Sequence, residues 1–379
     1  MNRNPKASQL GRMRHGARQP AQGRPMRSRS VQNRPVRLAA ACIVVAAWAM
    51  LVPCGCSKKP AIVADAAGRP LQRLTLGLNW YPEAEHGGYY AAQVHGYFAE
   101  EGLDVVIVSG GPESPVVQQV ASGERDFGVA NADNILFARA QQARVVAIMA
   151  PLQRSPRCIM VHAAAGIRDF ADLAHMRLGM STTQAFSHFL RKKAPLDNVQ
   201  IVPAPPNVAQ FLEDPRFGQQ AYVFSEPYIA RKRGADPQVL MLADLGFNPY
   251  TSLLLAAETT TRGKPELCRK LVRAAVRGWE KYLAEPADTN ARLQQLNPEM
   301  DADILAYGAA QMAPLVHPSG GDVPVGTMTP ARWRELGQQL VEADQLRAEQ
   351  VDSDGAFTLQ FLPAQKPAAS PAGAPSGRE

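Results

Sequence analysis

The sequence predicts an α/β protein with two domains, and three observations support this prediction. Short apolar strands alternate with amphipathic helices between Leu74 and Leu242, which is the order found in open α/β sheets. The chain has 379 residues, which is enough for two separate cores. Its 46% apolar and 20% charged residues are ordinary for a globular protein.

The first strand, helix and second strand are expected within Leu74–Val108. Apolar residues alternate with small or polar ones over residues 74–78, as on one face of a strand. A helix begins at Gly88 and is closed by Gly102, and residues 105–108 form the next strand. Strands joined in this way run parallel with a right-handed crossover. The loop after the first strand then lies at the carboxyl edge of the sheet, where open α/β folds bind ligands.

The same patterns predict the later elements, and helices predominate after Pro265. Further strands are expected at residues 124–130, 145–149, 159–161, 177–180, 199–202, 221–224 and 239–242. Helices are expected at residues 114–122, 135–142, 167–174, 181–190, 209–214, 266–284, 288–295, 301–312 and 330–343.

The basic residues that give the chain its net charge of +7 are concentrated at its start. Residues 1–37 contain ten Arg or Lys and no Asp or Glu, which leaves 31 basic against 34 acidic residues in the remainder. The folded part therefore has no cationic excess that would attract a phosphate backbone, and no nucleic-acid partner is expected.

Residues 1–56 are expected to form a signal or lipoprotein leader, and residues 57–72 a tether. The basic start is followed by an uncharged apolar run, Leu38–Val52, which is short for a membrane span but suits a secretory signal. A cysteine directly after such a run resembles the lipidation site of bacterial lipoproteins. Cys54 is the expected lipidation site and Cys56 the alternative, while an uncleaved anchor helix is the other interpretation. Each interpretation places the folded part outside the cytoplasm.

Two cysteines remain for the folded part, Cys158 and Cys268. Their neighbours are apolar, so two buried free thiols are expected, with a disulfide as the open alternative. No Cys/His cluster has the spacing of zinc ligands, and no metal site is expected. Residues 364–379 are rich in Ala, Pro, Ser and Gly and are expected to be disordered.

Several motifs between residues 74 and 363 match one known family. They are Leu78-Asn79-Trp80-Tyr81-Pro82, His86, Gly88, Tyr90-Ala91-Ala92, Gly96-Tyr97-Phe98, Glu101-Gly102-Leu103-Asp104-Val105, Gly123-Glu124-Arg125-Asp126-Phe127-Gly128, Glu226-Pro227, and Asp354-Gly355-Ala356-Phe357-Thr358 with Phe361-Leu362-Pro363. This set resembles the signature of the thiamine-pyrimidine-type periplasmic solute-binding proteins, the receptors of ATP-driven importers.

The resemblance implies a type II periplasmic-binding-protein fold, a two-lobed clamshell whose lobes are each a mixed sheet flanked by helices. It assigns residues 73–157 and 250–345 to lobe I and residues 158–249 to lobe II. It also implies a small heteroaromatic ligand, no cofactor, and an ABC permease with its ATPase as partners. The protein is then expected at the extracytoplasmic face of a membrane, held by its lipid anchor.

The loop after the first strand supplies the first ligand-binding candidates, Asn79, Trp80, Tyr81, His86 and Tyr90. The aromatic pair at residues 80 and 81 is placed to stack on a flat ring, and packing against the protein's own surface is the alternative. Asn79 offers a donor and an acceptor to ring edges. His86 either bonds to the ligand or caps the following helix. Tyr89 and Tyr90 fall on different helix faces, and the resemblance favours Tyr90 for the ligand.

Later strand ends supply the other candidates, Asn131, Asp133, Ser181, Thr182, Thr183 and Glu226. Asn131 and Asp133 follow a strand but also suit the N-cap of the next helix. Residues 181–183 precede a helix whose free N–H groups can bind anions or carbonyl oxygens. A carboxylate such as Glu226, directly after a buried strand, is costly unless it is paired. It is expected to engage the amino group and ring nitrogen of an aminopyrimidine, and a salt bridge to Arg231 is the alternative.

The resemblance implies a receptor for a pyrimidine precursor of thiamine, with riboflavin or an alkylsulfonate as alternative ligands. Glu83 and Glu85 stand where the family tends to have uncharged residues, and their charges favour a neutral or cationic ligand. The related pyrimidine synthases combine a cofactor-bearing lysine with a cysteine-rich metal motif. The chain has no such cysteine motif and no lysine between Lys59 and Lys192. An enzyme is therefore not expected, and a synthase-like activity is the remaining alternative.

Overall fold

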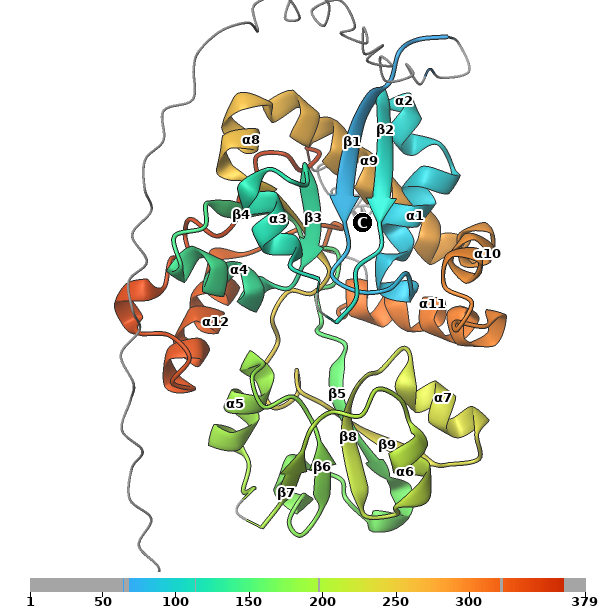
Figure 1. The fold of residues 1–379 in the computed structure, drawn as a ribbon, viewed down its shortest axis with the longest axis vertical. Helices are drawn as coiled ribbons and strands as arrows, with labels where there is room; N and C mark the ends of the chain where they lie inside the picture. Colours follow the sequence, from blue (N-terminus) through green and yellow to red (C-terminus); the bar gives the residue numbers. More distant parts are fainter. Residues whose placement is uncertain (1–63, 65–67, 113, 197, 321–322, 365–379) are drawn as a thin grey trace, which may run out of the picture. The chain divides into compact units, whose positions relative to one another are not determined.

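The computed structural model describes residues 64, 68–112, 114–196, 198–320 and 323–364, which are coloured in Figure 1. The predicted leader with Cys54 and Cys56, most of the tether, and the tail from residue 365 lie outside the described residues. The described part contains two five-stranded sheets flanked by helices. Both sheets mix parallel and antiparallel strands, which confirms the predicted α/β fold class.

In the first sheet the strand order is β2-β1-β3-β10-β4. Strand β1 pairs in parallel with β2 and β3, whereas β10 runs antiparallel to β3 and β4. The parallel pairing of β1 with β2 confirms the predicted strand–helix–strand unit. The bounds are Gln72–Gly77 for β1, Leu103–Val108 for β2, Phe127–Ala130 for β3, Val145–Met149 for β4 and Leu253–Ala257 for β10.

Strand β10 has no counterpart among the predicted strands. All of its residues are buried, because the strand lies between β3 and β4 with both faces covered, and so it shows no alternation. With β10 the chain returns to the first sheet after completing the second. Residues 150–156 lead from the first sheet to the second, and residues 242–252 lead back.

In the second sheet the strand order is β7-β6-β8-β5-β9. The bounds are Arg157–His162 for β5, Arg177–Gly179 for β6, Gln200–Val202 for β7, Phe217–Tyr222 for β8 and Pro237–Met241 for β9. The predicted position of β8, residues 221–224, is wrong. The strand ends at Tyr222 because the Ser225 N–H donates to the Tyr222 carbonyl and closes a turn there.

Helices cover both sheets and lie close to the predicted positions (Figure 1). There are three exceptions. Residues 226–232 and 258–263 form helices that were not predicted, residues 167–174 form only a 3-10 turn, and the first helix is interrupted where Gly96 adopts φ 76°. The helices are α1 Gly87–Val94, α2 Tyr97–Glu100, α3 Val116–Ser122, α4 Ala132–Ala140, α5 Ala185–Lys193, α6 Ala209–Glu213, α7 Glu226–Lys232, α8 Glu258–Gly263, α9 Pro265–Ala284, α10 Ala287–Leu296, α11 Ala302–Val316 and α12 Pro330–Glu342.

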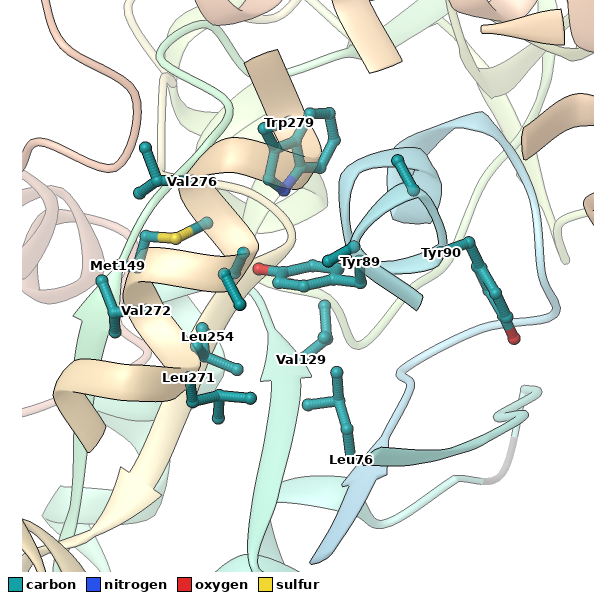
Figure 2. Packing of buried hydrophobic residues seen from close by; sticks show 14 of the residues in the cluster. Leu76, Tyr89, Tyr90, Val129, Met149, Leu254, Leu271, Val272, Val276 and Trp279 are labelled. Carbon is teal, nitrogen blue, oxygen red and sulfur yellow. The ribbon is translucent and has the colours of Figure 1, made fainter. Parts of the chain in front are cut away.

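Helices α1 and α9 pack closely in the core beside the first sheet. A Cβ atom on Gly88 would lie 2.1 Å from the Trp279 ring, and one on Gly278 would lie 2.1 Å from the Gly88 carbonyl oxygen. Tyr89 lies between this helix pair and the sheet, with its ring 6.0 Å from that of Trp279 (Figure 2). The start of α1, which follows the candidate ligand loop, is thereby held firmly against α9.

Cys158 and Cys268 are both free and buried, as predicted, and they lie in different hydrophobic clusters. Within the described residues, every helix is too short or too polar to cross a membrane.

Candidate functional site

The loop after β1 presents two aromatic rings to solvent. Trp80 and Tyr81 are 38% and 48% exposed, and their rings meet edge to face with centroids 5.5 Å apart. The loop packs against the turn after β2, where the Gly110 N–H donates to the Trp80 carbonyl at 3.0 Å. A Cβ atom at Gly110 would lie 2.1 Å from the Leu78 carbonyl oxygen, so only glycine allows this approach. The aromatic pair is thus held at the carboxyl edge of the sheet.

Two glutamates follow this pair and are buried. Glu83 and Glu85 are only 4% and 0% exposed, whereas the sequence suggested charges beside a pocket. Burial raises the pKa of Glu85 to about 7, against which the Ser252 hydroxyl acts by donating to its Oε2 at 2.6 Å. Burial, and next the nearby Glu85 and Glu226, raise the pKa of Glu83 well above its usual value. Both groups therefore take up protons far more readily than surface carboxylates.

His86 is completely buried beside these glutamates. Its Nε2–H donates to Asn79 Oδ1 at 3.1 Å, so the two predicted site residues contact each other. Burial lowers the pKa of His86 to about 3, so the imidazole is neutral. The 3.6 Å between its Nε2 and Glu85 Oε1 is consequently not an ion pair. Its side chain makes no capping bond to α1, which begins at the next residue.

Ser252 connects this loop to the chain returning from the second sheet. Its hydroxyl donates to Glu85, its N–H donates to Asn131 Oδ1 at 3.2 Å, and its carbonyl accepts from the Tyr89 hydroxyl at 2.8 Å. Ser252 adopts φ 52°, a conformation that non-glycine residues rarely adopt. Sequence reasoning missed Ser252, because its partners lie more than one hundred residues away along the chain.

The two adjacent tyrosines of α1 have different surroundings. Tyr89 reaches Ser252, and hence the glutamates, through its hydroxyl. Tyr90, the predicted ligand residue, is also buried but points away from Tyr89 (Figure 2). Burial raises the pKa of Tyr90, and the charge of Arg292 on α10 acts against this rise. The structure therefore brings Tyr89, and not Tyr90, to the other candidates.

Arg157, at the start of β5, is the principal cation among these groups. Its guanidinium lies over the rings of Phe186 and Tyr222, at 4.5 and 4.8 Å, and donates to the Tyr222 hydroxyl at 2.9 Å. Its charge lowers the pKa values of Glu85, Asp133 and Glu226, although burial outweighs it in each case. Sequence reasoning missed this role, and the available signal was an isolated Arg at the start of an apolar strand.

Glu226 is the first residue of α7 and lies shortly after the end of β8, close to the strand end where the sequence placed it. Its Oε2 accepts from the Tyr222 N–H at 2.8 Å, which satisfies one oxygen. Burial raises the pKa of Glu226, and the backbone bonds and Arg157 act against this. The alternative salt bridge to Arg231 is not what the structure has, because Arg231 donates to the Tyr307 hydroxyl at 2.7 Å.

Asn131 and Asp133 lie where β3 meets α4. Asn131 is the residue before α4, and its Oδ1 accepts from the Ser252 N–H. Burial raises the pKa of Tyr222, and a hydrogen bond with the Asn131 side chain acts against this rise. Burial raises the pKa of Asp133, and its Oδ1 has no hydrogen-bond partner among the described residues. Glu83, Glu85, Asp133 and Glu226 are hereafter called the acidic cluster.

Ser181, Thr182 and Thr183 form the turn before α5, and that helix begins at Ala185. The Ser181 hydroxyl accepts from the N–H groups of Thr183 and Gln184, both at 3.2 Å. The Ser181 N–H donates to Gln220 on β8. Thr182 and Thr183 are exposed, and the contacts of this turn do not join it to the acidic cluster within the described residues.

Two hollows of the described surface lie elsewhere. One of about 330 Å³ is lined by residues from the end of β5, from α6 and from the turn after α7, including His162 and Asp236, and one of about 200 Å³ lies at Asn248 and Arg332. Neither is lined by the acidic cluster or the aromatic pair. We take the cluster as the candidate site because it gathers buried polar groups from both sheets. In the described residues no group of three His, Cys, Asp or Glu side chains could hold a metal ion.

The fold is the type II periplasmic-binding-protein fold. The aliphatic sulphonate binding protein SsuA from Escherichia coli superposes with a TM-score of 0.58 at 15% identity, covering 80% of this chain and 98% of that one. At this identity the likeness establishes the architecture alone.

The chain belongs to the NMT1/THI5-like family, whose profile matches residues 83–289. The riboflavin-binding protein RibY of Chloroflexus aurantiacus is 26% identical over 80% of this chain and 91% of its own length. The formylaminopyrimidine-binding protein of Halalkalibacterium halodurans is 24% identical over 75% of this chain and 89% of its own. The 4-amino-5-hydroxymethyl-2-methylpyrimidine phosphate synthase THI11 of Saccharomyces cerevisiae is 24% identical over 61% of this chain and 73% of its own. The relatives thus include both binding proteins and synthases.

Proposed function

We propose that this protein is the extracytoplasmic solute-binding component of an ABC importer and captures a small nitrogen heterocycle such as a pyrimidine precursor of thiamine. One observation supports this most directly. An exposed aromatic pair, Trp80 and Tyr81, stands beside buried and half-buried carboxyl and amide groups that come from the elements of both sheets. A flat ring stacks on the aromatic pair while its edge exchanges hydrogen bonds with Asn79 and Glu226.

In this proposal residues 73–157 and 250–345 form one lobe and residues 158–249 the other. The ligand contacts Asn79 and Trp80 in the first and Glu226 in the second. Contacts to both lobes favour the closed form, so ligand binding shifts the population toward it. The turn at Ser181–Thr183 contacts the ligand only if it moves on closure.

The ligand class follows from the charges of the site. The acidic cluster disfavours an alkylsulfonate, since its carboxyl groups repel an anion when they are ionised. A pyrimidine and riboflavin both remain compatible with a flat stacking surface, and relatives bear names for each. Glu226 favours the pyrimidine, because a carboxyl group can pair with an amino group and a ring nitrogen together.

The partners and location belong to the same proposal. A lipid on Cys54, or on Cys56, anchors the chain at the extracytoplasmic face, and a permease with its ATPase receives the ligand. The second candidate function is a pyrimidine synthase, which the relatives bearing that name support. Against it stands the sequence, which has no lysine between Lys59 and Lys192 and no cysteine-rich motif in the folded part.

Thermal melting of the purified full chain tests the proposal. The ligands are the hydroxymethyl and formylamino pyrimidines, riboflavin and taurine, and a bound ligand raises the melting temperature. We expect a pyrimidine to do so, Trp80→Ala to weaken its binding by roughly ten-fold, and Glu226→Gln to weaken it further. Val94→Ala is the matched control, because Val94 is as exposed as Trp80 (38%) and lies on α1, outside the site. Turnover of a pyrimidine substrate, or no shift with any pyrimidine, contradicts the proposal.

A further inference from the structure

The acidic cluster has more negative groups than positive ones. Glu83 and Glu85 lie in and beside the 3-10 turn η1 (Ala84–His86), Asp133 on α4 and Glu226 on α7. Burial raises the pKa of each of these four carboxyl groups. Carboxyl groups gathered in this way are costly in their ionised form unless a counter-charge accompanies them.

The chain supplies little counter-charge. Arg157 is the cation that acts on Glu85, Asp133 and Glu226, and its guanidinium donates to the Tyr222 hydroxyl at 2.9 Å. His86 is neutral because it is buried. Within the described residues three of the four carboxyl groups therefore share one guanidinium, and the charges that act on Glu83 are those of Glu85 and Glu226.

The cluster also contains buried acceptor atoms without a hydrogen-bond partner at normal geometry, although the Asn79 side chain lies close enough to Glu85 to lower its pKa against the larger effect of burial. Glu85 Oε1, His86 Nδ1 and Asp133 Oδ1 are buried and lack a hydrogen-bond partner among the described residues, and the whole side chains of Glu85 and His86 are inaccessible to solvent. His86 Nδ1 is an acceptor, since Nε2 carries the proton that goes to Asn79. When Glu85 and Asp133 are ionised, the unsatisfied atoms are all acceptors, so the missing component is a donor.

We propose that the ligand of this site is a flat heterocycle that carries a positively charged nitrogen, whose N–H groups donate to Glu85 and to the Nδ1 of His86. This inference rests on the proposed function and narrows its ligand class to cations. The exposed face of Trp80 suits such a ligand, because a cation is attracted to an indole ring as well as stacked on it. A metal ion is the other obvious cation, but the described carboxyl groups are not placed to hold one.

Binding of a cation at this site is expected to release a proton, and that release can be measured. Glu85 is faced by Glu83, His86, Arg157 and Glu226, with Ser252 donating to it. A bound ammonium group favours the ionised form of Glu85, so the proton that Glu85 held passes to the solvent. Titration calorimetry in two buffers of different ionisation enthalpy measures the number of protons released when the ligand binds. We expect proton release near pH 6 to 7.

The decisive experiment compares two ligands of nearly equal shape. They are 4-amino-2-methylpyrimidine with a 5-aminomethyl group, which is an ammonium at neutral pH, and the same ring with a 5-hydroxymethyl group, which is uncharged. For the full chain at pH 7.5 we expect the ammonium compound to bind about ten- to one hundred-fold more tightly. Glu85→Gln keeps an acceptor for Ser252 and is expected to remove most of that preference. Glu124→Gln, on an exposed carboxylate that bonds to Gln119, is the control and should preserve it.

The outcomes separate this inference from the proposed function. Equal or tighter binding of the hydroxymethyl compound, or of riboflavin, overturns the charged ligand and leaves the solute-binding role standing. A preference that survives in Glu85→Gln, with folding verified by circular dichroism, also overturns it. Binding of none of these compounds overturns both.

Discussion

Ser252 bonds to Glu85 through its hydroxyl, and its two backbone polar groups are bonded as well. Its hydroxyl, N–H and carbonyl each bond to a different segment, namely the turn before α1, the start of α4 and Tyr89. These three bonds compensate for its backbone at φ 52°, which costs of the order of 1 kcal/mol for a residue with a side chain. The strain lies where the chain returns from the second sheet, directly beside the candidate site.

Glu85 makes the stability of the protein depend on pH in a specific direction. Its pKa is about 7 in the folded state against 4.5 for the free group. As pH rises from 4.5 to 7 the unfolded state loses this proton first, so the contribution of Glu85 to the free energy of unfolding falls, by about 3 kcal/mol in total. In the Glu85→Gln variant this contribution to the free energy of unfolding does not fall as pH rises, because glutamine does not ionise.

Urea unfolding between pH 4.5 and 8 checks this prediction. The free energy of unfolding of Glu85→Gln, minus that of the unaltered chain, should increase with pH and level off near pH 8. Glu83 and Glu226 are present in both proteins, and loss of the Glu85 charge lowers the folded-state pKa of Glu83, which changes the difference in the same direction. Parallel curves, or a difference that decreases with pH, would contradict the folded-state pKa of Glu85.

At the scale of elements, the ligand loop depends on the close approach of α1 and α9. Gly278 lies against the backbone of α1, since an added Cβ would meet the Gly88 carbonyl oxygen at 2.1 Å and Ala92 at 2.8 Å. Because one of these contacts is with backbone, the conflict cannot be relieved by a change of rotamer. The helices would have to separate, and Trp279 and Tyr89 would lose their packing (Figure 2).

Gly278→Ala is therefore expected to lower the free energy of unfolding by about 2 kcal/mol or more, measured by chemical denaturation. Gly263→Ala is the matched control, because a Cβ there meets nothing within 4 Å and Gly263 is also helical. The control should change stability by less than about 1 kcal/mol. Equal changes in the free energy of unfolding for the two substitutions would contradict the close-packing explanation.

The sequence located strands by alternation or by β-branched composition and missed the strand that has neither. Strand β1 alternates and was found in place, and the fully buried β4 was found through its Val and Ile residues, whereas β10 is buried on both sides and consists of Leu and Ala, which favour helices. For the site, Asn79 and Glu226 could be proposed because each follows a strand locally. Arg157 and Ser252 could not, because only the tertiary fold brings them to the glutamates.

At the scale of the molecule, α7 beside the second sheet is joined to α11 beside the first. Tyr228 and Tyr307 stack with centroids 4.6 Å apart, and Arg231 donates to the Tyr307 hydroxyl. Lys232 lies 2.6 Å from Asp301 and 3.2 Å from Asp303. Because α7 begins with Glu226, this contact also fixes where that carboxyl group lies relative to Glu83 and Glu85.

Removing Tyr307 should favour an open form of the proposed clamshell. The stacking that Tyr307→Ala deletes contributes about 1 kcal/mol, which corresponds to roughly a five-fold rise in the ratio of open to closed molecules. Small-angle X-ray scattering of the unliganded chain should then give a larger radius of gyration, and saturating ligand should restore the smaller one, since ligand contacts favour closure. Lys281→Ala is the control, because Lys281 pairs with Glu285 along its own helix and touches no part of the second sheet's helices in the described residues. An unchanged radius of gyration in Tyr307→Ala would mean that the α7–α11 contact does not hold the two lobes together.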